Sequence, residues 1–415
     1  MSSDLSAQST AARTRHRGIV SPKLKSCVFV LEGLNSLATT YFFYYLYFFT
    51  KEKFHFGTLD NFVLAASLGL IYTVSAILGG RFAQKHGYFF SLRLGVGVMV
   101  VSLLIGSQFE NFLPQLAILV MATIGMCFTW PSYQALVSEG EPPARLQGWI
   151  GLYNFTWAAT SAFAYFTGGA IIEKLGFKSM FLVPVGLLLL QLAFSFWLEK
   201  QVAKNDSPRA NADEKFSKPI PTEAHRSILP PKIFLKMAWL ANPFAYIAIN
   251  TVISIAPTLA DKLKLTPSQA GFFCSVWLFV RAGAFILLRL WPKWHYRFHF
   301  LAGAYATMVV CFALMLLATN LFVLIVAEIF FGLSLGLIYY TSLFYSMNAG
   351  ETKGKHGGIH EAAIGAGCCT GPAMGAVALY FFPNHPDSGA WAVSILLLAG
   401  LGGLFWLRFK NQKVC

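Results

Sequence analysis

The composition of this chain is that of a membrane protein. Its 415 residues are 56% hydrophobic and 16% aromatic but only 12% charged, with a mean hydropathy of +0.57, whereas a soluble domain carries about 25% charged residues. The composition therefore excludes an ordinary soluble enzyme. The net charge of +14 is assigned to a surface beside anionic lipid, without a nucleic-acid partner.

Twelve apolar runs are long enough to cross a membrane, which takes about 20 helical residues. The short alternating segments that are typical of outer-membrane barrels do not occur, so the backbone must satisfy its hydrogen bonds within helices. We therefore predict an all-α integral membrane protein with twelve transmembrane helices. The predicted helices lie near residues 26–49, 61–80, 89–107, 112–134, 149–172, 179–197, 237–257, 269–290, 298–318, 321–347, 358–382 and 390–407.

The first run follows a polar and basic segment, "MSSDLSAQSTAARTRHRG". No small-residue cleavage site follows the run closely, so we expect the first helix to stay in the mature protein. With the N-terminus in the cytoplasm, 25 of the 32 lysines and arginines fall on cytoplasmic segments, Lys23 and Lys25 of the tail among them, and six fall outside. This bias predicts a multi-pass protein of the cell inner membrane with both termini in the cytoplasm.

A long polar stretch, rich in proline and charge, divides the chain between the sixth and seventh helices. We predict a cytoplasmic N-terminal tail, an N-terminal six-helix bundle, a cytoplasmic central loop, a C-terminal six-helix bundle and a cytoplasmic C-terminal tail. Their predicted bounds are 1–24, 25–200, 201–235, 236–408 and 409–415.

The two bundles repeat certain residues at an offset of 210, which indicates pseudo-symmetry. Arg145 and Gly148 precede the fifth helix as Lys355 and Gly358 precede the eleventh. The same offset relates two polar stripes, spaced i, i+4, i+8 and i+12, that each follow one helix face. We expect these stripes to border a polar path between the halves. They comprise Glu32, Ser36, Thr40 and Tyr44 on the first helix and Asn242, Tyr246, Asn250 and Ser254 on the seventh.

The turn between the second and third helices, "GGRFAQKHGYFF" (79–90), resembles the loop signature of the major facilitator superfamily, G-x-L-A-D-R-x-G-R-R. In register are Gly80, Phe82, Ala83, Lys85 and Gly87, while Gln84 stands at the aspartate and Tyr88 and Phe89 replace the basic pair. With the twelve helices and the central loop, the resemblance covers residues 25–408. It implies the two-bundle transporter fold of that family, in which Gly80, Lys85 and Gly87 would act as gating elements.

A second packing signature lies in the eleventh helix, "GAGCCTGPAMGA", in which Gly367, Gly371 and Gly375 are spaced four residues apart. This spacing permits another helix to approach closely, and Pro372 permits a kink. Gly371, Pro372 and Arg145 are therefore further candidates for a gate, with a static close-packed interface as the alternative.

Three ionisable residues inside predicted helices are weighed as functional groups, because a charge there is costly and marks a functional site by default. Glu32 is a candidate proton carrier or, alternatively, a structural acid near the cytoplasmic helix ends. Arg281 is always charged and needs an anion, which is either the substrate or Glu328 on the tenth helix. We also assign Glu328 to proton coupling.

Further candidate substrate-binding groups are polar residues of the helices around the expected path. They are Asn35, Thr39, Tyr133, Gln134, Asn154, Asn242, Tyr246 and Asn250. By contrast, we expect His360 and Glu361 at the cytoplasmic rim, as part of a gate or of a solvated helix start.

Together these residues predict a secondary active transporter that moves a small organic solute, anionic or carboxylated, with proton coupling by alternating access. Symport and antiport would use the same groups. The alternatives are a facilitative transporter or exporter of amphipathic or lipid-like molecules, and a non-transporting sensor with a transporter-like fold. We expect no enzymatic activity, no cofactor and no metal site, because nucleotide-binding and hydrolase motifs are absent and the seven cysteines lack metal-ligand spacing. The expected partners are the substrate, protons and membrane lipid, and we expect a monomer.

Overall fold

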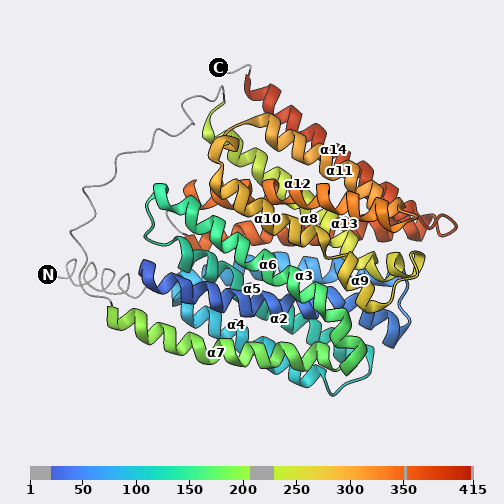
Figure 1. Ribbon diagram of the computed structural model, residues 1–415, viewed down its shortest axis with the longest axis horizontal. Coiled ribbons are helices and arrows are strands. Elements are labelled where there is room, and N and C mark those ends of the chain that lie inside the picture. The colour runs from blue at the N-terminus through green and yellow to red at the C-terminus, as the bar shows by residue number, and fades with distance from the viewer. Residues whose placement is uncertain (1–19, 206–228, 350–352, 413–415) are drawn as a thin grey trace.

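A computed structural model describes residues 20–205, 229–349 and 353–412 (Figure 1). The regular secondary structure of these residues is entirely helical. Most of the predicted N-terminal tail and central loop, together with residues 413–415, lies outside the described residues.

The first half of the chain contributes six long helices, as predicted. They are α2 (Pro22–Phe54), α3 (Thr58–His86), α4 (Tyr88–Gly106), α5 (Phe112–Ser138), α6 (Pro143–Leu175) and α7 (Ser179–Asn205). The second half repeats the pattern, except that its second crossing is broken into α9 and α10. Its helices are α8 (Pro231–Lys262), α9 (Pro267–Phe273), α10 (Val276–Leu290), the 3-10 turn η3 (Pro292–Trp294), α11 (Phe298–Leu317), α12 (Leu321–Ala349), α13 (Lys353–Phe381) and α14 (Ser388–Gln412).

Hydropathy alone accounts for most of these crossings. Within the described residues, ten helical segments are long and apolar enough to span a membrane, with α9 and α10 counted as one. The two long helices outside that set are α2 and α6. Both carry buried polar residues, Glu32 and Asn35 on α2 and Asn154 on α6. These two helices cross the bundle interior, where neighbouring helices rather than lipid meet their polar side chains.

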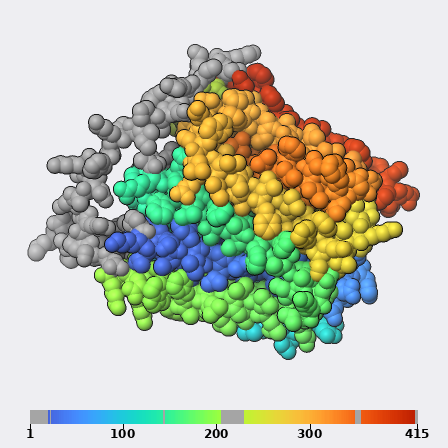
Figure 2. All heavy atoms as spheres, in the orientation of Figure 1, coloured from blue at the N-terminus to red at the C-terminus, as the bar shows by residue number. Residues whose placement is uncertain are grey.

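The chain forms two bundles that lie against each other. Figure 1 shows α2–α7 in the lower part of the molecule and α8–α14 in the upper part. At the boundary α3 lies along α13, and α6 lies along α9 and α10. Figure 2 shows the second of these seams, where the green atoms of α6 meet the yellow atoms of the second bundle. Because the number of crossings is even, α2 begins and α14 ends at one membrane face, which we call the N-side; the opposite face is the far side.

Glycines allow α3 and α13 to touch at the level of the backbone. A Cβ atom at Gly80 would lie 2.6 Å from the Cα of Gly358 and 2.7 Å from the carbonyl oxygen of Gly354. Further along the same seam, a Cβ at Gly69 would lie 2.3 Å from the backbone nitrogen of Cys369. Any side chain at these positions would push the two halves apart.

The turn after α3 braces the halves without the aspartate of the superfamily signature. Gly87 has a φ of 100°, a conformation that glycine adopts without steric cost. One turn earlier, the Oε1 of Gln84 accepts a hydrogen bond of 3.0 Å from the backbone N–H of Gly354 at the start of α13. A neutral amide thus takes the place of an ionic contact. Lys85 and Arg145, the basic residues assigned to the gate, are exposed at this face.

We expect Gly80→Ala to lower the thermal unfolding midpoint, because overpacking a close contact costs about 1–3 kcal/mol. Gly97→Ala is the matched control, since Gly97 lies inside α4 and an added Cβ meets nothing within 4 Å. There the better helix propensity of alanine should leave the midpoint unchanged or raise it. Equal midpoints for the two variants would show that α3 and α13 do not keep this close approach.

Two glycines of the α13 run pack inside their own half, while the third, Gly375, faces Phe62 of α3 in the first half. A Cβ at Gly367 would meet the carbonyl oxygen of Pro243 at 2.1 Å, and one at Gly371 would meet that of Ile247 at 2.6 Å, both on α8. The helix continues through Pro372 to Phe381. The predicted close approach is therefore confirmed as contact, while a gating role for Gly371 and Pro372 stays a prediction.

On the far side the halves also touch. The hydroxyls of Thr58 on α3 and Thr258 on α8 are 2.8 Å apart, and Lys51 forms an ion pair with Asp261. Contacts between the halves thus occur at both ends of the helices.

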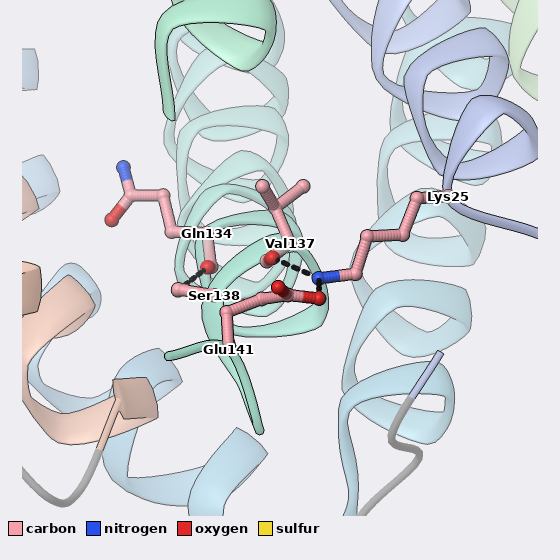
Figure 3. Close-up of polar contacts among 5 residues, drawn as sticks. All are labelled: Lys25, Gln134, Val137, Ser138 and Glu141. Carbon is pink, nitrogen blue, oxygen red and sulfur yellow. Dashed lines mark hydrogen bonds and ion pairs between the residues drawn. The ribbon is translucent and has the colours of Figure 1, made fainter. Parts of the chain in front are cut away.

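One residue counted with the cytoplasmic tail has a different environment. Lys25 is fully buried, and its Nζ lies 2.6 Å from Oε1 of Glu141 and 2.6 Å from the carbonyl oxygen of Val137. Figure 3 shows the lysine reaching from α2 to the end of α5 and the segment that follows it. Hydropathy marked Lys25 as a polar flank, but α2 begins at Pro22 and brings the side chain against its neighbour. Lys25 is therefore a tertiary contact rather than a tail charge.

Candidate functional site

A cavity of about 180 Å³ lies between the two halves. Helices α2, α3, α5 and α6 of the first half and α8, α12 and α13 of the second contribute to its wall. Much of the wall is aromatic. The rings are those of Phe43, Tyr44, Tyr47, Tyr72, Trp130, Trp157, Tyr246 and Tyr339.

Glu361 is the one carboxylate among the residues that line this cavity. It is 3% exposed, and it accepts hydrogen bonds from the hydroxyl of Tyr72 and from Nε2 of Gln134. Both donors belong to the first half, whereas Glu361 belongs to the second. This carboxylate therefore joins the halves at the cavity wall.

The expected place of His360 and Glu361 at the rim is wrong. Helix α13 begins at Lys353, before its apolar run, so Glu361 lies eight residues along it, or about 12 Å at 1.5 Å per residue. The imidazole Nδ1 of His360 lies 3.2 Å from the hydroxyl of Ser342. Both side chains are buried.

Arg281 on α10 is 1% exposed and packed among aromatic rings. Its guanidinium carbon lies 4.7 Å from the ring centre of Trp157, 4.8 Å from that of Tyr339 and 5.8 Å from that of Tyr246. These three rings also line the cavity. In the described part of the chain, Nε of Arg281 has no hydrogen-bond partner, and the ion pairs are Lys25–Glu141, Lys51–Asp261 and Arg93–Glu199. The arginine is thus a buried cation, held by cation–π contacts, without a carboxylate partner in the described residues.

In the described residues Glu328 forms no ion pair with Arg281. Its Oε2 instead accepts a 3.2 Å hydrogen bond from the backbone N–H of Trp277, at the beginning of α10. The first N–H groups of a helix lack partners within it, and a carboxylate there also complements the helix dipole. The break between α9 and α10 accounts for a buried acid at this position.

Glu32 lies in a polar cluster inside the first half, not among the residues that line the cavity. Its Oε1 accepts a 2.7 Å hydrogen bond from Ser36, and its Oε2 has no partner in the described residues. Nearby, Nε2 of Gln191 donates to the hydroxyl of Tyr133 at 2.5 Å and to Oδ1 of Asn35 at 3.4 Å. Three residues that the sequence singled out, Glu32, Asn35 and Tyr133, are therefore gathered behind the wall.

The structure divides the predicted substrate-binding residues into two groups. Thr39, Tyr246 and Asn250 line the cavity. The others are not lining residues, and in the described structure the amide atoms of Asn154 and Asn242 have no hydrogen-bond partner. This second group comprises Asn35, Tyr133, Gln134, Asn154, Asn242 and Arg281.

Sequence reasoning missed Tyr72 as a partner of Glu361. Tyr72 sits inside an apolar run on α3, where a single tyrosine looks like packing. The available signal was its position near the middle of that run, away from the membrane interfaces where tyrosines gather.

Two helical bundles around a central cavity are typical of a polytopic membrane transporter rather than an enzyme. Residues 28–372 match the family model of the Major Facilitator Superfamily, and the chain belongs to this superfamily. Comparison with curated proteins gives no match.

Two solved structures share the fold. The human organic anion transporter MFSD10 (TETRAN) superposes with a TM-score of 0.68 at 14% identity, over 94% of this chain and 100% of that one. The nucleoside transporter NupG, solved as a point mutant, gives a TM-score of 0.64 at 13% identity, over 94% of this chain and 99% of that one. At such identities the likeness concerns the fold alone.

Proposed function

We propose that this protein is a secondary active transporter that moves a small organic anion, carboxylated in the simplest case, by alternating access between its two halves. The observation that carries the proposal is Arg281, a buried cation with no carboxylate partner in the described residues, packed against rings of the cavity wall. A guanidinium cannot lose its charge, and its planar fork matches a carboxylate.

The aromatic wall suits the remainder of such a solute. Cation–π contacts offset only part of the free-energy cost of burying the guanidinium. A carboxylate that enters the site would offset more of this cost, and its hydrogen bonds to the guanidinium would be strong because the site already excludes water. Rings such as Trp157 and Tyr339, which touch Arg281 and line the cavity, would bury the apolar part of the molecule.

We further propose that the transport is coupled to protons through Glu32. Its carboxyl group is fully buried, receives one side-chain hydrogen bond, from Ser36, and forms no ion pair in the described structure. A buried carboxyl without a cation is suited to carry its charge only transiently. Glu328 accepts a hydrogen bond from the start of α10, and this structural role is enough to explain why a carboxyl group is buried there. We therefore rank Glu328 second as the proton carrier.

The proposed location follows from the charge pattern of the loops. The excess of lysine and arginine at the N-side supports a cell inner membrane protein with both termini in the cytoplasm. The substrate and lipid are its proposed partners, nucleic acid is not, and we propose that it acts as a monomer.

Arg281→Gln tests the proposal. We expect the affinity for an organic carboxylate to fall about 10- to 100-fold, because hydrogen bonds to charged groups contribute about 1.5–3 kcal/mol. The measurement is ligand-induced thermal stabilisation of the purified chain, followed by uptake into proteoliposomes with an imposed pH gradient. Arg289→Gln is the matched control, since Arg289 lies on the same helix and is exposed. If both variants bind carboxylates as the native protein does, Arg281 is not the anion site.

The second candidate is transport of amphipathic or lipid-like molecules, which the aromatic wall favours. It predicts that lipids or neutral amphiphiles stabilise the native protein and Arg281→Gln equally. Binding without any substrate exchange across proteoliposomes would instead identify a sensor with a transporter fold.

A further inference from the structure

The cavity wall has an acidic side chain where an anion requires a basic one. Among the described residues that line it, Glu361 is the one acid, and no lysine or arginine is present. Arg281 lies outside the lining set and touches three of its rings. A purely anionic solute would therefore lie next to a carboxylate, which costs free energy by repulsion in a site of low dielectric.

Many of the hydrogen-bond donors of the wall are already in use. The hydroxyls of Thr39, Thr40 and Thr123 donate to groups outside the cavity. The amide nitrogen of Asn250 donates to the sulfur of Cys368 at 2.7 Å, and the hydroxyl of Tyr72 donates to Glu361. The other tyrosine hydroxyls and the indole N–H groups of Trp130 and Trp157 remain as donors. The oxygen acceptors of the wall suit a ligand that donates.

Glu361 has acceptor capacity to spare. A carboxylate offers about four lone-pair sites, and the side chains that donate to Glu361 are Tyr72 and Gln134. None of the ion pairs in the described residues involves it. Its missing counter-charge would come from the cavity.

The surrounding rings fit a cation as well. The faces of tryptophan, tyrosine and phenylalanine attract ammonium groups, and aromatic cages are the usual sites for such ligands. Several rings of the wall are not among those that contact Arg281. Of these, Tyr72 bonds Glu361 directly, and Tyr44 and Trp130 complete the wall on the side of the first half.

Tyr339 links Arg281 to the cavity that Glu361 lines. The guanidinium carbon of Arg281 lies 4.8 Å from the ring centre of Tyr339, and Tyr339 and Glu361 both line the cavity. A single small molecule that contacts Tyr339 can thus approach both Arg281 and Glu361.

From this arrangement we infer that Glu361 and the surrounding rings form an ammonium site, and that the substrate is a small zwitterion with an apolar body. Its carboxylate would bind Arg281 and its ammonium group Glu361. The carboxylate part of this inference rests on the proposed function, in which Arg281 binds the anion. The ammonium part does not. The inference removes the conflict between an anionic solute and a cavity wall whose described lining residues include a carboxyl group but no basic side chain.

The first test uses a matched set of probes on the purified full chain: phenylalanine, 3-phenylpropionate, which lacks the amine, and phenethylamine, which lacks the carboxylate. We expect phenylalanine to bind the native protein about tenfold or more tightly than either analogue, because it alone engages both charges. Glu361→Gln should weaken phenylalanine and phenethylamine and spare 3-phenylpropionate. Arg281→Gln should weaken phenylalanine and 3-phenylpropionate and spare phenethylamine.

The outcomes separate the two proposals. If 3-phenylpropionate binds as tightly as phenylalanine and Glu361→Gln changes neither, the ammonium site is wrong and the organic-anion transporter stands. If phenethylamine binding depends on Glu361 while Arg281→Gln changes nothing, the ammonium site stands and the anion proposal is wrong.

A second measurement needs no change at Glu361. Cys368 lines the cavity, so its alkylthiolation rate reports the local charge. We expect a trimethylammonium-ethyl methanethiosulfonate to modify Cys368 about tenfold or more faster than the sulfonato-ethyl reagent, after both rates are divided by those for a small free thiol. Peptide mass spectrometry, with Cys368→Ser as the control, identifies the modified site. A faster reaction with the sulfonate would overturn the ammonium site.

Discussion

A disulfide between Thr58→Cys and Thr258→Cys should reduce transport about a hundredfold or more, and a reductant should restore it. Thr58 begins α3 in the first half, Thr258 lies near the end of α8 in the second, and their hydroxyls are 2.8 Å apart on the far side. Side chains this close can bring two Cβ atoms within the roughly 3.5–4.5 Å that a disulfide requires. Alternating access needs the halves to separate on this side. Substrate binding can shift the equilibrium between the closed and open conformations only by its difference in affinity for the two. A covalent bond between the halves is stronger than that difference, so it should hold the far side closed.

The measurement is substrate exchange in proteoliposomes before and after oxidation. Each single-cysteine variant controls for the substitution itself. A disulfide between Thr50→Cys and Asn61→Cys controls for the effect of any disulfide on transport. The native side chains form a 2.7 Å hydrogen bond, but they lie on α2 and α3 of the same half, so this disulfide should not hold the two halves together. Full exchange in the crosslinked Thr58→Cys/Thr258→Cys protein would show that the halves need not part on the far side.

The fold was largely predictable because a membrane imposes a single strong rule on the sequence. Each crossing must be a helix of about 20 apolar residues, so apolar runs found the helices, and the turn at Gly80 and Gly87 indicated the superfamily. The helix ends were less predictable. Hydropathy marks where the hydrocarbon begins, but α13 starts at Lys353, and this difference moved Glu361 from the expected rim to the cavity wall.

The candidate site was only partly predictable for a second reason. Periodicity puts residues on one helix face but does not say which neighbour covers that face. The stripe on α2 shows the limit: Thr40 and Tyr44 line the cavity, while Glu32 on the same stripe is covered by the first half. Likewise Arg281 was rightly singled out as a buried charge, but its aromatic surroundings come from four different helices.

Replacing Lys25 alone should destabilise the protein more than Gly80→Ala does. Lys25 is fully buried and Glu141 is 7% exposed, with 2.6 Å between Nζ and Oε1 (Figure 3). The Nζ also lies 5.1 Å from the ring centre of Trp149. Removing one partner of a buried ion pair leaves the other charge uncompensated, which costs about 3–5 kcal/mol. Lys25→Met should therefore lower the free energy of unfolding by this amount, measured by thermal or denaturant unfolding in a single detergent.

Two further variants test whether the loss of stability in Lys25→Met comes from breaking the buried ion pair rather than from removing a lysine. In Lys25→Met/Glu141→Gln neither partner of the pair carries a charge, so most of the stability should return, as it does when a buried pair is replaced by neutral groups. Lys51→Met breaks an ion pair whose side chains are 37% and 65% exposed, and an exposed pair contributes only about 0–1 kcal/mol. If Lys25→Met is no less stable than Lys51→Met, water reaches the Glu141 carboxylate, and the start of α2 is not packed against the end of α5 in the folded protein.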